Sequence, residues 1–165
     1  MANFLSINEL NTFEFHDARF KNIEISTENM VWELQQVNVT TKNSQNNLNV
    51  DMEAGILLLT FQNWKATKIE HYGRKTYDQK GTLIKEEPGI IAPIEDYHKI
   101  LTAIPVDQGW ISRISRYNKE QDSYKFSIDI LSCSDSLIVD LEYSEAKAEW
   151  DVFLSEAWYV NWNPK

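Results

Sequence analysis

The residues with the clearest chemical potential in this sequence are histidines that stand next to acids. His16 precedes Asp17, and a histidine beside a carboxylate can act as a general base with its orienting group. Neighbouring residues on a strand point to opposite faces, so a structural role at a strand start is the favoured interpretation. His71, after Glu70, would join His16 and a carboxylate in a metal site or a hydrolase only if their strands were neighbours. No two histidines have the i, i+4 spacing of a helical metal site, so we predict no metal and no cofactor.

Sequence motifs for catalysis are missing. The chain has no G-x-S-x-G, no G-x-x-x-x-G-K-[ST], no G-x-G-x-x-G and no H-E-x-x-H. The single cysteine, Cys133, has no nucleophile motif around it and is expected to be a small buried thiol in or just after a strand. These absences favour a binding protein over an enzyme, and we assign no catalytic residue.

Acidic side chains are concentrated toward the end of the chain. Between Asp135 and Glu156 there are seven acids and one basic residue, Lys147, whereas residues 65–87 contain six Lys and Arg and four acids. An acidic strand face can simply keep a protein in solution, and it can also be a docking surface for a basic partner. On the second interpretation the partner-binding residues are Asp129, Asp140, Glu142, Glu145, Glu149, Asp151 and Trp158.

Aromatic residues cluster beside these acids, at Trp150, Trp158, Tyr159 and Trp162. Most of them are expected in the core, because large aromatic side chains dominate core energetics. An exposed aromatic ring surrounded by carboxylates would instead anchor a protein partner or stack on a sugar. A small-ligand or carbohydrate-binding β domain is therefore the alternative function.

Charge and hydropathy exclude several classes of protein. The 165 residues contain 16 Lys and Arg and 25 Asp and Glu, for a net charge of −9. Nucleic acids and anionic membranes both attract a basic surface, so we expect neither as a partner. No run of 18 apolar residues is present, and residues 1–6 lack the basic start of a signal peptide. The sequence therefore predicts a cytoplasmic protein.

The stretch from Tyr124 to Trp150 carries the strongest structural signal. Apolar and polar residues alternate over 124–133 and again over 137–150, separated by a Ser/Asp-rich connection. Period-two alternation on both sides of a turn predicts two long antiparallel strands with one apolar face. That face requires a second layer, which the rest of the chain must supply.

The other elements follow from weaker patterns. Residues 93–104 are the clearest helix, with Pro93 in its first turn and Pro105 expected to end it. Capping-box spacing at Ser6 and Glu9 is compatible with a short N-terminal helix. After Trp150 both strand and helix periodicities fit, and we favour a short helical turn. We predict further strands over 18–26 with a bulge near 21–22, 30–40 with a bulge near 35–36, 56–69 with a break at 62–63, 82–85 and 110–117, and a mobile polar loop over 40–47.

These elements predict one α+β domain over residues 1–165, mostly antiparallel β. The expected architecture is a sandwich or half-barrel of about six to eight strands with one central helix over 93–104. A further hypothesis divides it into two related three-stranded units, over about 18–69 and 110–150, because each runs strand, turn, strand, loop, strand.

Several of these segments resemble a loose group of small bacterial β-rich domains that open with an FHD motif. The similarity lies in Phe15-His16-Asp17-Ala18, in Ile23-x-Ile25, in Trp32-x-Leu34-x-x-Val37, in Leu57-x-Leu59-x-Phe61-x-Asn63-Trp64 and in the ending from Glu149 to Trp158. Some members of the group are thought to be immunity proteins of polymorphic toxin systems. The resemblance implies a similar fold and transfers no catalytic residue. Together with the charge, it makes a non-enzymatic protein that binds a basic partner, such as a toxin, the leading hypothesis.

Overall fold

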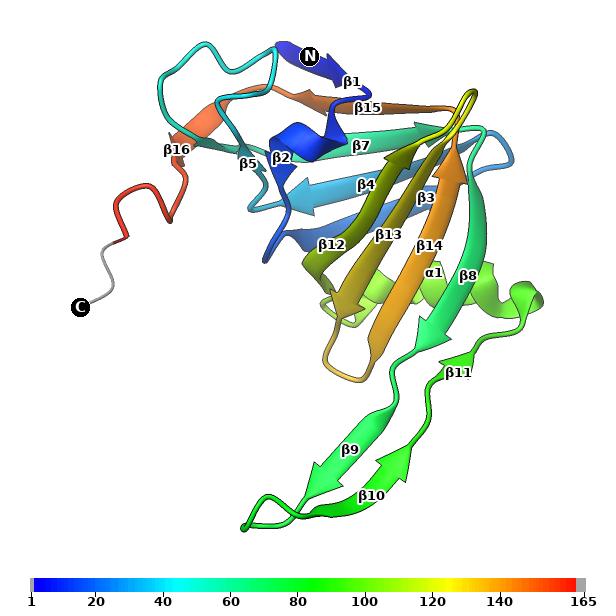
Figure 1. Cartoon of the computed structure of the whole chain (residues 1–165). Helices are drawn as coiled ribbons and strands as arrows, with labels where there is room; N and C mark the ends of the chain where they lie inside the picture. The colour runs from blue at the N-terminus through cyan, green and yellow to red at the C-terminus, as the bar shows by residue number, and fades with distance from the viewer. Residues whose placement is uncertain (1, 163–165) are drawn as a thin grey trace.

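The structure is a computed structural model that describes residues 2–162, and it confirms the α+β, mostly antiparallel fold class. The main sheet has ten strands, more than the six to eight predicted, and it curves into a half-barrel (Figure 1). Its strands, in spatial order, are β1 (Phe4–Ile7), β15 (Glu145–Trp150), β7 (Leu57–Gln62), β4 (Asn29–Gln35), β3 (Arg19–Ile25), β12 (Trp110–Lys119), β13 (Tyr124–Leu131), β14 (Ser136–Tyr143), β8 (Lys65–His71) and β11 (Ile90–Ile91).

Two smaller sheets accompany the main one. A four-stranded sheet covers one end, and a two-stranded hairpin projects from the other (Figure 1). The four strands are β16 (Phe153–Glu156), β6 (Met52–Ala54), β5 (Asn38–Val39) and β2 (Phe13–Glu14), and the hairpin consists of β9 (Arg74–Tyr77) and β10 (Leu83–Glu87).

The curvature of the main sheet comes from two strands that bend at the same level. β7 continues into β8 after Asn63, whose φ is 49°, and β14 continues into β15 after Ser144. The two bent strands stay paired around the corner, and the Asn63 amide donates to the Ser144 hydroxyl over 2.9 Å. As a result β15, β7, β4 and β3 cross β12, β13, β14 and β8 steeply, and the apolar faces of the two groups enclose the core.

The core is aromatic at its centre. Trp32 lies 4.7 Å from Phe61, and Phe61 lies 4.9 Å from Tyr143, measured between ring centroids. All three side chains are fully buried, and they come from β4, β7 and β14. Burial raises the pKa of the Tyr143 hydroxyl above its ordinary value, so this tyrosine stays protonated.

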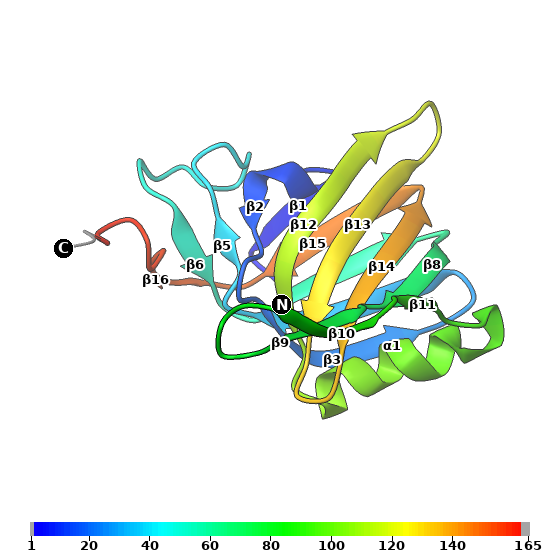
Figure 2. The ribbon, with the colours of Figure 1, turned by 60° about the horizontal axis from the view of Figure 1, so that its bottom comes forward.

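The predicted helix is present, with small differences at its ends. Residues 94–96 form the 3-10 helix η2 (Ile94–Asp96), and α1 (Tyr97–Val106) ends one residue beyond Pro105. Leu101 and Ile104 are its buried residues, and Figure 2 shows α1 lying along β3.

The central antiparallel pair and the bulge in β3 are confirmed, but the strand predicted over 137–150 divides at Ser144 into β14 and β15. β13 and β14 pair in unbroken register from Tyr124–Tyr143 to Leu131–Ser136, and the register of β3 with β4 shifts between Phe20 and Asn22.

Four local predictions were wrong. The strand predicted over 30–40 is two strands, because Gln36 adopts a φ of 61° and redirects the chain from β4 to β5 in the smaller sheet. After Trp150 the chain forms β16 instead of a helical turn. Residues 4–7 are strand β1, and only a 3-10 helix, η1 (Leu10–Thr12), follows. The loop over 40–47 is anchored by the buried amides of Asn43 and Asn46.

The two predicted three-stranded units have the same strand order and direction. β3, β4 and β7 form one antiparallel meander, and β12, β13 and β14 form another. Each third strand then bends into the other half, where β8 pairs with β14 and β15 pairs with β7. Their origin by duplication stays a hypothesis, which superposition of the two triplets would test.

Candidate functional site

The predicted acidic residues lie on two different parts of the sheet. Asp129, Asp140 and Glu142 are on β13 and β14, whereas Glu145 and Glu149 are on β15 beyond the bend. Asp151 follows β15 and Trp158 follows β16, near the C-terminal end. The bend at Ser144 therefore separates residues that the sequence analysis placed on one surface.

Asp129 is not available to a partner. It is only 5% exposed, and its carboxylate pairs with the Arg113 guanidinium of β12. The Tyr72 hydroxyl donates to the same carboxylate over 3.1 Å. The hydrogen bond and ion pair with Asp129 raise the pKa of Arg113, so its guanidinium stays charged.

The other two acids of this group also have basic neighbours. Asp140 accepts a hydrogen bond from the Ser127 hydroxyl and lies 3.8 Å from the Lys68 ammonium. Glu142 lies opposite Lys125 on one side and opposite Lys65 on the other, in the registers of β14 with β13 and β8. Opposite charges in facing positions stabilise a sheet.

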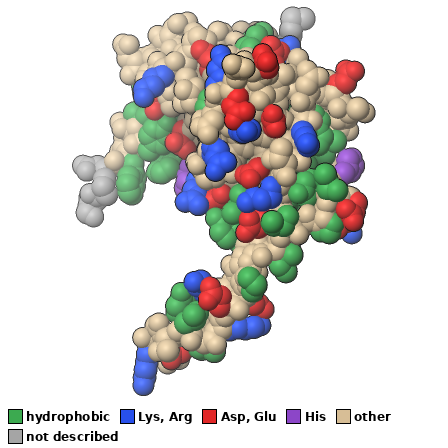
Figure 3. Space-filling model, turned by 45° about the vertical axis from the view of Figure 1, so that its right-hand side comes forward, with side chains coloured by type: hydrophobic (Ala, Val, Ile, Leu, Met, Phe, Trp, Pro, Cys, Tyr) green, Lys and Arg blue, Asp and Glu red, His purple; other side chains and the backbone are tan. Residues whose placement is uncertain are grey.

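The outer face of β12, β13, β14 and β8 is therefore a mixture of both signs rather than an acidic face. Figure 3 shows Lys and Arg side chains interspersed with Asp and Glu on this side of the molecule. The prediction of one acidic face on the central strands was wrong in this respect, because strand pairing brings basic residues of earlier strands beside the acids.

The acidic excess of the chain lies in the other half. Residues 1–62 contain eight Asp and Glu and three Lys and Arg, and residues 144–162 contain four acids and Lys147. These two segments form β1 to β7, β15 and β16. By contrast, residues 63–143 contain thirteen acids and eleven basic residues. The half built around β15 and β7 therefore carries most of the net charge.

On this acidic half, one sheet face exposes large apolar residues. In β1 the usual pattern is inverted, because Ser6 is buried while Leu5 and Ile7 point outward. Leu5 lies opposite Glu149 of β15, and Glu149 lies opposite Leu58 of β7. We call this surface the acidic–apolar face; its residues are Leu5, Ile7, Glu33, Ile56, Leu58, Glu145, Lys147 and Glu149.

The apolar members of this face are substantially exposed. Leu5, Ile7, Ile56 and Leu58 each have between 42% and 49% of their surface exposed. Single exposed apolar residues are ordinary. Here those of β1 and β7 lie on both sides of the charged side chains of β15, on one sheet face. The carboxylate of Glu145 lies 3.3 Å from Lys147, and Glu149 forms no ion pair with any residue from 2 to 162.

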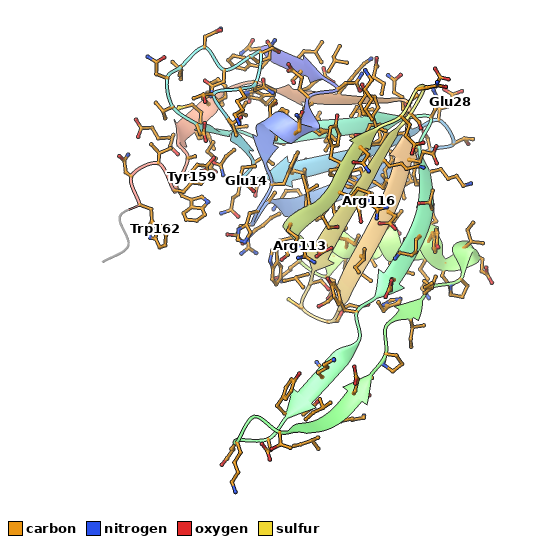
Figure 4. The ribbon with its side chains drawn as sticks, viewed as in Figure 1. Glu14, Glu28, Arg113, Arg116, Tyr159 and Trp162 are labelled. Carbon is orange, nitrogen blue, oxygen red and sulfur yellow. The ribbon has the colours of Figure 1, made fainter. Side chains whose placement is uncertain are left out.

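The C-terminal segment adjoins this face. Asp151 and Leu154 line a cavity of about 560 Å³ that Ile56 also lines. Further along, Trp158 is 56% exposed, and its ring contacts those of Tyr159 and Trp162. Figure 4 shows Tyr159 beside Glu14, with Trp162 farther out.

Tyr159 fixes the C-terminal segment to the body. Its hydroxyl donates to the Asp51 carboxylate over 2.9 Å. Burial and this hydrogen bond both raise the pKa of Tyr159 above its ordinary value. The hydrogen bond therefore persists at neutral pH and holds Trp158 in place.

The histidines do not form a common site. His16 is exposed and pairs with Asp17 over 3.0 Å, whereas His71 pairs with Asp135 over 2.5 Å. The two lie in separate cavities, His71 in one of about 360 Å³ beside α1. Across residues 2–162, no hydroxyl or thiol is hydrogen-bonded to His71, and no group of three or more potential metal ligands occurs. The hydrolase hypothesis therefore has no supporting geometry.

Cys133 was predicted to be buried, and it is exposed. It lies in the turn between β13 and β14, where its backbone N–H donates to the Asp107 carbonyl oxygen over 3.1 Å. The prediction failed because the strand ends at Leu131 and not at residue 133.

Two features were missed in the sequence. The inverted strand β1 could have been found from Phe4-Leu5-Ser6-Ile7, where apolar residues occupy both parities. The projecting hairpin was reduced to one short strand over 82–85, because its partner β9 is polar apart from Tyr77.

Comparison with protein-family models, with curated proteins and with solved structures gives no match. Within residues 2–162, none of the helices has the length and apolar character needed to cross a membrane. The assignment of function therefore depends on the geometry of the chain itself.

Proposed function

We propose that this protein is a non-enzymatic binding protein that docks a basic protein partner on its acidic–apolar face. The observation that carries the proposal is the row Leu5, Glu149 and Leu58, in which outward apolar side chains flank a carboxylate on adjacent strands. Apolar residues at the centre of an interface supply most of the affinity, and complementary charge raises the association rate.

The charge distribution favours a basic partner over a neutral one. The half of the molecule that carries this face holds twelve acids and four basic residues over residues 1–62 and 144–162. A positively charged protein would be attracted to that half from a distance, and the attraction would weaken as salt increases. Glu145, Glu149 and Asp151 remain partner-binding residues in this proposal, while Asp129, Asp140 and Glu142 do not.

A toxin is the partner class that the sequence resemblance adds to the proposal. An immunity protein blocks its toxin by binding it, so it needs a complementary surface and no catalytic residues. The acidic–apolar face would meet that requirement for a basic toxin. This narrower proposal is tested by co-expression with the product of a neighbouring toxin gene.

The direct test compares two charge reversals of equal size. The partner is captured by crosslinking on the native protein, purified, and titrated against variants by calorimetry at two salt concentrations. We expect Glu149→Lys to weaken binding at least tenfold and Leu58→Thr to weaken it severalfold, because they change charge and apolar area on the face.

The matched control is Glu95→Lys, at an exposed position beside α1. It changes the net charge by the same amount and is expected to leave affinity within twofold. Equal weakening by Glu149→Lys and Glu95→Lys would show that only net charge matters, and it would overturn the assignment of the face. In the toxin assay, protection of cells should be lost with Glu149→Lys and kept with Glu95→Lys.

The exposed indoles favour carbohydrate binding as a second candidate. Trp158 and Trp162 are both more than half exposed, and their rings lie 6.3 Å apart between centroids. Such rings are suited to stacking on a sugar. If this function is correct, a glycan panel should change tryptophan fluorescence in the native protein and not in Trp158→Ala. Unchanged fluorescence across the panel would remove this candidate.

A further inference from the structure

The hairpin of β9 and β10 projects from the body as an arm, which we define as residues 72–89. Figures 1 and 3 show it extending away from the rest of the molecule. Every residue of both strands is exposed, and within residues 2–162 β9 and β10 pair only with each other. The arm is therefore a two-stranded ribbon whose faces and outer edges are in contact with water.

At the base of the arm, the two strands lie close together beside Gly73 and Gly89. A Cβ on Gly73 would lie 2.5 Å from the Glu87 carbonyl oxygen and 2.8 Å from the backbone nitrogen of Gly89. A Cβ on Gly89 would in turn lie 2.6 Å from a carboxylate oxygen of Glu70. At Gly73 the atoms met are backbone atoms, so only glycine allows the two strands to approach this closely, whereas the Glu70 side chain beside Gly89 can move. The arm is thus a continuation of the β8–β11 pair and not a loose loop.

The arm exposes apolar side chains that its own fold does not bury. Tyr77 and Leu83 lie opposite each other across the ribbon, and Ile84 occupies the bulge beside them. Their exposed fractions are 55%, 45% and 65%. An isolated two-stranded hairpin is at best marginally stable in water, so packing of these residues against another surface would stabilise it.

Four of the seven charged side chains of the arm form ion pairs with one another. Lys75 pairs with Glu86 over 2.9 Å, and Lys85 pairs with Glu87 over 2.7 Å. The arm as a whole holds four basic residues and three acids. It therefore has almost no net charge, in a chain whose net charge is −9.

This charge distribution indicates what covers the arm. Two copies of a protein with a net charge of −9 repel each other when their bodies approach. Contact through two nearly neutral, projecting arms keeps the acidic halves apart and buries apolar residues from both. A surface that carries paired charges of both signs can also meet its own copy across a two-fold axis, the commonest symmetry of homodimers.

We propose that the arms of two copies of this chain pack together through Tyr77, Leu83 and Ile84 and form a symmetric dimer. This interface is separate from the acidic–apolar face, so the dimer leaves both partner-binding surfaces free. The arm is small compared with a standard interface, which needs about 20–30 residues on each side. We therefore expect a dimer that dissociates on dilution, with a Kd of about 1–100 μM.

Sedimentation equilibrium of the full chain over a range of concentrations tests the proposal. We expect a monomer–dimer equilibrium that the double substitution Leu83→Ser/Ile84→Ser weakens at least tenfold. The matched control is Val106→Ser/Leu154→Ser, at exposed apolar positions on α1 and β16. The control should keep the dimer of the native protein. A native protein that stays monomeric at 200 μM would overturn the proposal.

Salt distinguishes arm-to-arm contact from the docking of one arm on the acidic half of another copy. Arm-to-arm packing should become tighter as salt screens the repulsion between the bodies. Dimers that dissociate as salt rises, or that persist in Leu83→Ser/Ile84→Ser, would contradict the proposed interface. Because no partner is present in this experiment, its outcome does not depend on the proposed binding function.

Discussion

At the scale of single residues, the buried side-chain amide of Asn43 fixes a loop whose sequence is entirely polar. Asn43 is buried, and its amide nitrogen donates to the Ser6 hydroxyl over 3.0 Å and to the Thr12 hydroxyl over 2.7 Å. Its side-chain oxygen accepts from the Gln45 backbone N–H over 2.9 Å. One side chain therefore connects the loop over 40–47 to β1 and η1. A run of polar residues gives no sign of this, because burial depends on what packs above the loop.

Replacing Asn43 by Ala should lower the free energy of unfolding by about 1–3 kcal/mol, because it leaves buried hydrogen-bonding groups without a partner. Urea denaturation measures the change. The control is Asn47→Ala, at an exposed position of the same loop, which we expect to change stability by less than about 0.5 kcal/mol. Equal effects of the two substitutions would contradict the role of Asn43.

At the scale of elements, Asp107 joins the end of α1 to the turn between β13 and β14. Its carboxylate accepts hydrogen bonds from the hydroxyls of Ser132 and Ser134 and from the Ser134 backbone N–H. The two serine hydroxyls lower the pKa of Asp107 below its ordinary value of 3.8. Folding therefore favours the ionised carboxylate, and this contribution is present above pH 3.8 and is lost as pH falls through the lowered pKa.

The variant Asp107→Asn should accordingly be less stable than the native protein at pH 7, and the difference should shrink below pH 3.8. Urea unfolding at several pH values measures the difference. The control Asp122→Asn, at an exposed position in a loop, should show no such convergence. A deficit for Asp107→Asn that is constant down to pH 2.5 would rule out a role for its ionised form.

The arm gives a second prediction at this scale. Gly73→Ala places a Cβ against the backbone of the opposite strand, so the strands must separate at the base of the arm. Limited trypsin digestion should then cleave at Arg74 or Lys75 faster than in the native protein, while urea unfolding of the body changes little. The control Thr76→Ala changes an exposed position of the same strand without placing a new Cβ against the backbone. Slow cleavage of Gly73→Ala would show that the base tolerates a side chain.

How far the sequence predicts the fold depends on the element. β13 and β14 could be predicted because alternation from Tyr124 to Tyr143 is regular. The break at Gln36 could not, because a left-handed φ at a glutamine has no sequence signal, and a strand with a bulge fits the same residues. The pairing of Lys65 with Glu142 could not be predicted either, because it depends on which distant strands are neighbours. This is why the predicted acidic surface was misplaced.

At the scale of the whole molecule, the two meanders are interlocked. β8, which follows the first meander, pairs with β14, and β15, which follows the second, pairs with β7. Each half therefore completes the sheet of the other. The aromatic core is shared in the same way, since Phe61 of β7 contacts Tyr143 of β14.

It follows that fragments 1–92 and 93–165 should be unfolded when expressed separately, because each lacks the strands that cover its apolar face. Mixed in equal amounts, they should recover the near-ultraviolet circular dichroism of the intact chain. Cooperative unfolding of either fragment alone would show that the halves are independent. Heating the mixture should give a midpoint that rises with concentration, as expected for two associating chains.

The bend at Asn63 and Ser144 has a consequence for synthesis on the ribosome. β7 finds its partner β15 only after residue 150 has left the exit tunnel, so the nascent chain holds an incomplete, apolar sheet for most of its translation. Contacts between residues so distant in sequence also make folding slow. The newly made polypeptide should thus depend on chaperones until β15 emerges, and stalling translation just before β15 should leave it sensitive to protease.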